Sequence, residues 1–181
     1  MSYVDVDSRL VLSVVIALAA LPSPAALPLL TPAAFSSSPY AAPGEDLLET
    51  IGWPQFADAV SQAVATIPAS DRAGAVIYAG NYGEAGALER YGPARHVPPV
   101  YSGHNAFGSW GPPPEGSSPV VVITERFVPG RRSEFTGCRL AVRFDNGLNV
   151  KNEEQGDSIW VCDGPVSGWK AAWPDLVHLM G

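Results

Sequence analysis

The sequence predicts an α/β fold, a single layered domain in which helices flank a mixed, largely parallel sheet. Continuously apolar runs at residues 75–79 (AVIYA) and 119–124 (PVVVIT) are typical of strands covered on both faces. Residues 139–144 (RLAVRF) alternate instead, with Leu140, Val142 and Phe144 on one face, as in a half-buried strand. Segments with helical spacing of apolar residues lie between these strands, and this mixture favours a layered α/β domain.

A hydrophobic segment precedes the domain. It is indicated by residues 10–44, which contain no charged residue. Residues 10–30 are nearly long enough in apolar residues to cross a bilayer, which takes about 20. Pro22 and Pro24 interrupt the run, and residues 1–9 are less basic than a secretory signal requires. A membrane helix with a proline kink is the favoured interpretation. A signal-like segment and a buried soluble helix are the alternatives.

The chain therefore divides into three predicted parts. Residues 1–30 form the hydrophobic, membrane-helix-like segment, residues 31–44 an extended linker rich in Pro, Ser and Ala, and residues 45–181 the folded domain. The first helix of the domain starts near Trp53, and Pro54 suits its first turn. Its apolar stripe consists of Phe56, Val60, Val64 and Ile67.

The remaining predicted elements follow in chain order. They are a short helix over residues 84–91, a strand at residues 100–101, a short helix over residues 131–135, a strand at residues 158–162 and helical turns over residues 169–179. Residues 145–147 (DNG) are a turn signature, and a polar loop follows them.

Composition excludes some classes of partner. Eleven basic residues against eighteen acidic ones give a net charge of −7, and no basic patch of the kind that binds nucleic acid is visible. Nucleic acid is therefore not an expected partner. Cys138 and Cys162 are the only cysteines, and both a disulfide and two free thiols fit their strand-like surroundings. No metal-ligand spacing or cofactor motif is present, so we expect neither a metal nor a cofactor.

Polar and aromatic side chains follow two predicted strands, where open α/β sheets tend to bind ligands. The ligand-binding candidates are Asn81, Tyr82, Glu84, Tyr101, Ser102, His104, Asn105 and Trp110. Aromatic faces and amide side chains among them suit the hydroxyl groups of a sugar.

Each group also has a structural interpretation. Asn81 and Glu84 have the spacing of a helix capping box, which we favour over an anion-binding loop. His104 is expected to serve as a turn residue, with ligand binding or acid/base chemistry alongside Glu84 as the alternative, including a small hydrolase. Residues 152–156 (NEEQG) are expected to form a solvated loop, since adjacent carboxylates make a poor acid/base pair.

Several segments together resemble one known family. They are residues 80–93 (GNYGEAGALERYGP), 98–114 (PPVYSGHNAFGSWGPPP), 152–165 (NEEQGDSIWVCDGP) and 169–174 (WKAAWP). Their order and spacing resemble the C-terminal extracytoplasmic region of bacterial polytopic GT-C-type glycosyltransferases, the dolichyl-phosphate-mannose protein mannosyltransferase-like family. Residues 49–56 (ETIGWPQF) resemble the point where the chain of that family leaves its last membrane helix. The resemblance covers roughly residue 10 to the C-terminus.

The resemblance implies a membrane enzyme that takes a sugar from a polyprenyl-phosphate donor and passes it to an acceptor outside the cell membrane. Catalytic acidic residues of that family lie in its first extracytoplasmic loop, which Asp5 and Asp7 do not match, so no catalytic residue is carried over. The matching positions in this chain are Asn81, Tyr82, Glu84, Ser102, His104, Asn105, Trp110 and Glu153.

The expected function is accordingly that of a C-terminal accessory domain, inactive on its own. We expect it at the cell membrane with residues 45–181 on the extracytoplasmic side. Its expected partners are the membrane and, in the intact enzyme, a glycan or polyprenyl-phosphate sugar. The alternative is an independent membrane-anchored or secreted module that binds a small glycan-type ligand.

Overall fold

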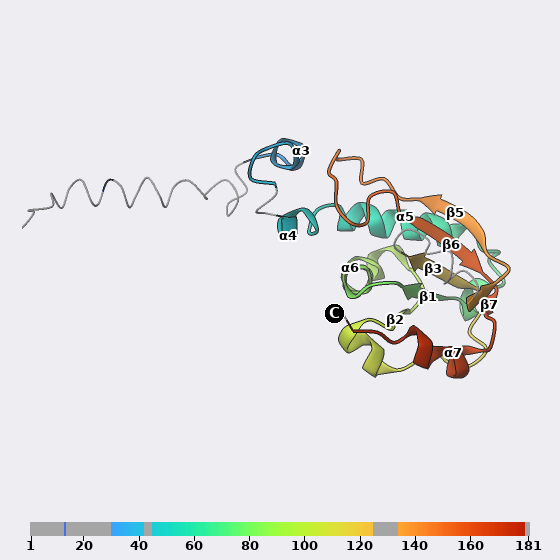
Figure 1. Ribbon diagram of the computed structural model, residues 1–181. Coiled ribbons are helices and arrows are strands. Elements are labelled where there is room, and N and C mark those ends of the chain that lie inside the picture. Colours follow the sequence, from blue (N-terminus) through green and yellow to red (C-terminus); the bar gives the residue numbers. More distant parts are fainter. Residues whose placement is uncertain (1–12, 14–29, 42–44, 125–133, 180–181) are drawn as a thin grey trace, which may run out of the picture. The chain divides into compact units, whose positions relative to one another are not determined.

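A computed structural model describes residues 13, 30–41, 45–124 and 134–179, which belong to two compact units (Figure 1). The larger unit comprises Gly52–Gly147 and Glu153–Gly181, and the smaller comprises Met1–Ile51 and Leu148–Asn152. The compact domain therefore begins at Gly52, a few residues after the expected start at residue 45.

The larger unit contains a five-stranded sheet with the order β2-β1-β3-β6-β5. Its strands are β1 (Val76–Ala79), β2 (Val100–Ser102), β3 (Val120–Thr124), β5 (Arg139–Arg143) and β6 (Ser158–Cys162). β1 pairs in parallel with β2 and β3, whereas β6 pairs antiparallel with β3 and β5. The prediction of an α/β fold with a mixed sheet is confirmed. Two of the four strand pairings in this sheet are parallel, whereas the sequence predicted a largely parallel sheet.

Helices cover both faces of this sheet, which explains why β1 and β3 are apolar throughout. On one face Ile77, Val121 and Ile123 pack with α5 (Trp53–Ala65) and α6 (Tyr82–Tyr91). On the other face Tyr78 and Val122 pack with α7 (Trp169–Leu176). The result is a three-layer arrangement around two apolar cores.

Short elements complete the larger unit. They are the 3-10 helices η1 (Arg72–Gly74), η2 (Pro93–Arg95) and η3 (Asn105–Trp110) and the two-stranded ladder of β4 (Phe135–Thr136) with β7 (Gly164–Pro165). Of the helix expected over residues 131–135, Glu134 has 3-10 conformation, Phe135 lies in β4, and residues 131–133 lie outside the described residues.

The first helix of the domain forms as its pattern predicts. Gly52 caps α5 with a φ of 99°, which favours glycine, and Pro54 occupies the first turn. The stripe residue Phe56 is fully buried and packs edge-to-face on Trp53 and Phe144, with ring centroids 5.7 and 5.3 Å apart. Such aromatic pairs contribute about 1 kcal/mol each beyond their buried area. Phe56 thus joins the aliphatic residues of α5 in packing this helix on the sheet.

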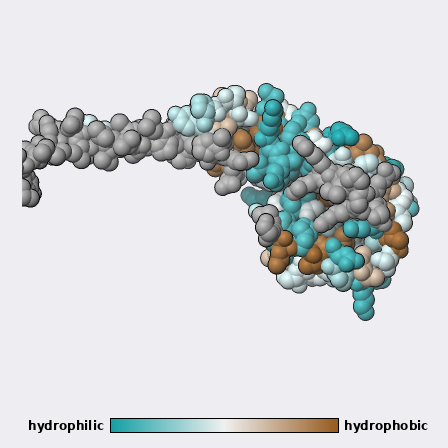
Figure 2. All heavy atoms as spheres, in the orientation of Figure 1, coloured by the Kyte–Doolittle hydropathy of each residue, from teal (hydrophilic) through white to brown (hydrophobic). Residues whose placement is uncertain are grey.

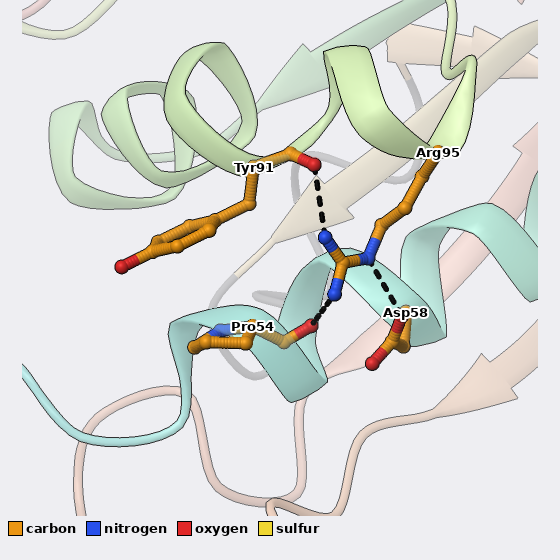
Figure 3. A network of polar contacts seen from close by, with 4 residues as sticks. All are labelled: Pro54, Asp58, Tyr91 and Arg95. Carbon is orange, nitrogen blue, oxygen red and sulfur yellow. Dashed lines mark hydrogen bonds and ion pairs between the residues drawn. The ribbon is translucent and has the colours of Figure 1, made fainter.

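An arginine fastens α5 to the segment after α6 (Figure 3). The Arg95 guanidinium donates from Nε to Asp58 Oδ1 at 2.6 Å and from Nη2 to the Pro54 carbonyl at 3.1 Å. Its Nη1 donates to the Tyr91 carbonyl at 3.0 Å, so one side chain holds three points together. Arg95 lowers the pKa of the Asp58 carboxyl, mainly through this hydrogen bond.

The alternating strand differs from its prediction in one respect. The register of β5 against β6 shifts between Leu140 and Val142, as at a β-bulge. Because a bulge resets the alternation, Leu140 is 44% exposed while Phe144 is buried at 3%. Leu140 therefore does not share the buried face predicted for it.

Cys138 and Cys162 are joined in a disulfide, so of the two alternatives left open by the sequence, a disulfide or two free thiols, the first is correct. It links the residue before β5 to the last residue of β6. The same apolar core that includes Trp169 and Trp173 contacts both cysteines.

The smaller unit contains short helices where an extended linker was expected. α3 (Pro32–Ser36) begins after Thr31, whose side-chain oxygen accepts from the Ala34 N–H, and α4 (Glu45–Leu48) follows. Phe35, Leu48 and Val150 form its small apolar cluster. The linker prediction is therefore wrong for residues 32–36, where a hydroxyl cap and a proline in the first turn start a helix.

The predicted membrane segment at residues 10–30 lies outside the described residues, except for Ser13 and Leu30. Among the residues that the structure describes, no helix combines the length and the apolar character that a membrane crossing demands.

Candidate functional site

The loops after β1 and β2 lie side by side at one edge of the sheet. Because these strands are parallel and paired Ala79 to Ser102, their carboxyl ends meet there. The Tyr82 backbone N–H donates to His104 Nδ1 at 3.3 Å, and the two rings pack edge-to-face with centroids 5.1 Å apart. The structure thus brings together the two loops that the sequence singled out. We call this region the carboxyl edge.

Asn81 and Glu84 form the capping box that the sequence favoured. Asn81 Oδ1 accepts from the Glu84 N–H at 2.7 Å, and Glu84 Oε2 accepts from the Asn81 N–H at 3.1 Å. Both residues are buried, Glu84 completely. These bonds satisfy backbone donors at the start of α6, so the pair serves the helix terminus.

Burial also changes the acidity of Glu84. Desolvation raises its pKa well above the ordinary value, opposed in part by the hydrogen bond from the Asn81 N–H. The nearby carboxyls of Asp157 and Glu154 raise the pKa further, since like charges disfavour ionisation. Glu84 therefore tends to hold its proton at pH values where an exposed glutamate is ionised.

Glu154 and Asp157 belong to the same edge, although the sequence placed Glu154 in a solvated loop. Ser158 pairs with Thr124 at the carboxyl end of β3, which puts the residue before it at this edge. Glu154 is 3% exposed and Asp157 is 1% exposed, so the prediction of a solvated loop is wrong for Glu154. Residue types alone gave no sign of this burial, because it depends on the return of the chain beside β3.

His178 is a further member of the site that sequence reasoning missed. Its ring stacks on His104 with centroids 4.6 Å apart. Its backbone N–H donates to the Gly103 carbonyl, and its carbonyl accepts from the Asn105 N–H, both at 2.9 Å. The segment after α7 thus runs beside the His104 loop as a short parallel bridge. Only the tertiary arrangement brings residues 74 positions apart into contact.

Gly103 permits that close approach. A Cβ at this position would lie 1.9 Å from the Leu176 carbonyl oxygen, nearer than any real contact allows. Ser102 is 1% exposed, and its Oγ accepts from the His104 N–H at 3.2 Å. Asn105 adopts a φ of 53°, a left-handed conformation that asparagine tolerates better than most residues. The polar atoms of this loop thus fix its own shape.

The two remaining candidates lie apart from the His104 contacts. Tyr101 is half-buried and packs on the apolar core beneath α7. Trp110, the last residue of η3, is 69% exposed and packs on Phe107 with ring centroids 4.4 Å apart.

Exposed aromatic and apolar side chains surround the buried polar ones. Tyr82 is 48% exposed, Val177 is 39% exposed and Leu179 is 77% exposed. Hydrophobic atoms are visible near the segment after α7 in the space-filling view (Figure 2). In the described part of the larger unit, no three His, Cys, Asp or Glu side chains gather their ligand atoms within 4.8 Å. The exposed side chains of this edge are therefore aromatic and aliphatic.

Comparison of the chain with family models, with curated proteins and with solved structures finds no match.

Proposed function

We propose that residues 45–181 are the extracytoplasmic accessory domain of a membrane glycosyltransferase that uses a polyprenyl-phosphate sugar donor. In this proposal the carboxyl edge contacts the glycan part of an acceptor. The observation that carries it is the exposed Tyr82 ring in the first turn of α6. This ring packs edge-to-face on buried His104, whose Nδ1 accepts from the Tyr82 N–H. A fixed aromatic face next to hydroxyl and amide groups suits a sugar ring.

Two further observations support the extracytoplasmic location. The Cys138–Cys162 disulfide is of a kind that persists in oxidising compartments outside the cytosol. The uncharged residues 10–44 provide a segment that suits a membrane helix. Both agree with the family resemblance of residues 80–93 and 98–114, which supplies the donor class.

Catalysis by the carboxyl edge itself has little geometric support. Glu84 is fully buried and its Oε2 already accepts a backbone hydrogen bond, so it cannot reach a substrate proton directly. His104 Nδ1 accepts from the Tyr82 N–H, which leaves the proton of the neutral ring on Nε2. These bonds favour an accessory role over the small hydrolase considered from the sequence.

An independent binding module is the second candidate. The observation in its favour is that every contact among Tyr82, His104 and His178 lies within the larger unit. Such a module would bind its ligand without a membrane partner. An accessory domain supplies only part of a larger site and is expected to bind weakly alone.

Titration of the full chain with α-mannobiose, followed by NMR chemical shifts, tests both candidates. Dissociation in the millimolar range favours the accessory domain, and micromolar dissociation favours the independent module. Tyr82→Ala is expected to weaken binding about tenfold, in line with the loss of one aromatic stacking contact. Val166→Ala removes a more exposed apolar side chain elsewhere and should change nothing.

Two results would contradict the proposal. Unchanged affinity in Tyr82→Ala, with the fold intact by circular dichroism, would remove the carboxyl edge as the glycan contact. Mannosyl transfer from a polyprenyl-phosphate donor by the purified chain alone would show a catalyst rather than an accessory domain.

A further inference from the structure

A hollow of about 490 Å³ opens at the opposite edge of the sheet, where β1 and β3 begin. In Figure 1 this edge lies toward β7, where the arrow of β6 ends. Buried Ile67 and Val161 line the hollow together with exposed Asp71, Arg139 and Asp163. Its volume falls within the range of about 300–1,000 Å³ typical of small-molecule sites. We call this region the amino edge.

The walls of this hollow are fixed by covalent and hydrogen bonds. The Cys138–Cys162 disulfide joins the residues directly before Arg139 and directly before Asp163, so it fixes the backbone from which both charged side chains extend. The Ser118 hydroxyl donates to the Asp163 carbonyl at 2.6 Å and bridges the start of β3 to the end of β6. A site with such walls needs little rearrangement to receive a ligand.

Arg139 is oriented so that part of its guanidinium remains available. Nη2 donates to the Thr66 carbonyl at 3.0 Å and to Thr66 Oγ1 at 2.9 Å. Within the described residues the guanidinium makes no other hydrogen bond, which leaves Nε and Nη1 for an anion. Each of these nitrogens can donate a charge-assisted hydrogen bond to a carboxylate oxygen.

The two acidic residues give the hollow charge of the opposite sign. Asp71 Oδ1 accepts from the Ser70 hydroxyl at 2.8 Å, and no other side-chain hydrogen bond of either aspartate is seen in the described part of the chain. Two carboxylates against one guanidinium leave the lining with one net negative charge. A matching ligand carries a carboxylate for Arg139 and ammonium groups for the aspartates.

We infer that the amino edge binds a small molecule bearing one carboxylate and two ammonium groups, the chemistry of a basic amino acid. This site lies at the edge opposite Tyr82 and His104, and it does not depend on the function proposed for them.

The test is a titration of the full oxidised chain with L-lysine, followed by NMR. Two further probes each lack one charged group of L-lysine. 1,5-diaminopentane lacks the carboxylate, and 6-aminohexanoate lacks the second ammonium. L-lysine is expected to bind at least about tenfold more tightly than either, because each lost charged hydrogen bond costs about tenfold or more. Equal affinity for L-lysine and 1,5-diaminopentane, or no binding of L-lysine, would overturn the inference.

Variants assign the contacts. Arg139→Gln should weaken L-lysine binding about tenfold without weakening 1,5-diaminopentane binding, since it removes a charge that repels a dication, whereas Asp71→Asn should weaken both. Arg143→Gln is the matched control, since Arg143 is an exposed arginine on the same strand that does not line the hollow. Thermal unfolding shows whether each variant is folded. L-lysine affinity unchanged in both folded variants, Arg139→Gln and Asp71→Asn, would contradict the assignment to this hollow.

Discussion

The two edges of the five-stranded sheet use their polar side chains in different ways. At the carboxyl edge Asn81 and Glu84 cap the start of α6, and His104 accepts a hydrogen bond from the Tyr82 backbone, so their chief effect is to fix the backbone there. At the amino edge Arg139 and Asp163 are exposed around a hollow with donors and acceptors to spare. The comparison teaches that a recognisable motif, here the Asn81–Glu84 capping box, can serve the fold alone. The hollow beside Arg139 forms where the sequence shows no motif. The following predictions test this division.

The largest effect on stability is expected from Gly103→Ala, which places an extra carbon in the carboxyl edge. Its Cβ would lie 1.9 Å from the Leu176 carbonyl oxygen, so the segment after α7 must move away. We expect a loss of about 3 kcal/mol in the free energy of unfolding, measured with urea. Gly86→Ala in α6 is the control, because nothing lies within 4 Å of the added carbon there. It should stabilise the protein by about 0.5–1 kcal/mol, and a comparable loss in both variants would refute the steric argument.

Reduction of the Cys138–Cys162 disulfide should act chiefly on the amino edge. The bond closes a loop with a sequence separation of 24, for which chain entropy gives a stabilisation of about 3 kcal/mol. Urea unfolding with and without a reductant measures the loss. Amide hydrogen exchange should accelerate more at the start of β5 than at His104. Equal acceleration at both edges would show that the two edges do not respond independently.

Glu84→Gln should separate the capping role of this residue from the cost of its charge. The folded-state pKa of Glu84 is raised, so wild-type stability is fully present below the unfolded pKa and is lost as pH rises toward the folded one. Glutamine keeps an acceptor for the Asn81 N–H but cannot ionise. The variant should match wild type at low pH and exceed it by about 1–3 kcal/mol at neutral pH. Unfolding curves across this pH range decide, and a variant less stable at neutral pH would contradict the expectation.

Glu115→Gln should weaken the start of α7. The carboxylate accepts from the Trp169 N–H at 3.1 Å and from the Lys170 N–H at 3.0 Å, so it caps this helix from a distant loop. Loss of the charge at a helix N-terminus should cost about 1 kcal/mol. Near-ultraviolet circular dichroism, sensitive to Trp169, and urea unfolding measure it. Glu89→Gln near the end of α6 is the control and should not reproduce the loss.

The smallest effect is expected from Arg95→Lys. The ammonium group cannot span the Asp58 carboxylate and both carbonyls that the guanidinium bonds, yet the Asp58 side chain is 56% exposed, which weakens the ion pair. We expect a slight fall in Tm that added salt diminishes. A fall as large as that of Gly103→Ala would mean that this contact governs the packing of α5.

Local patterns predicted most of the larger unit. The apolar stripe of α5, the continuously apolar β3 and the Asn81–Glu84 capping box each depend on residues close in sequence, and each formed as expected. The helix over residues 32–36 was missed because a Pro- and Ser-rich composition suggested an extended chain, although the first-turn proline was visible.

What could not be predicted depends on distant contacts. The stacking of His178 on His104 and the burial of Glu154 and Asp157 follow from where the chain returns beside the sheet. The exposure of Leu140 follows from a register shift that an alternating pattern cannot reveal. The Cys138–Cys162 bond required knowing that β5 and β6 are neighbours.

That register shift has a consequence for the behaviour of the protein in concentrated solution. β5 is the last strand of the sheet, and its outer backbone groups form a template on which another chain could add. The irregularity between Leu140 and Val142, flanked by Arg139 and Arg143, distorts and charges that template. Natural sheets avoid edge-to-edge aggregation by such means. Replacing both arginines with valine would leave exposed Leu140 on an uncharged edge, where self-association would compete with the folded monomer.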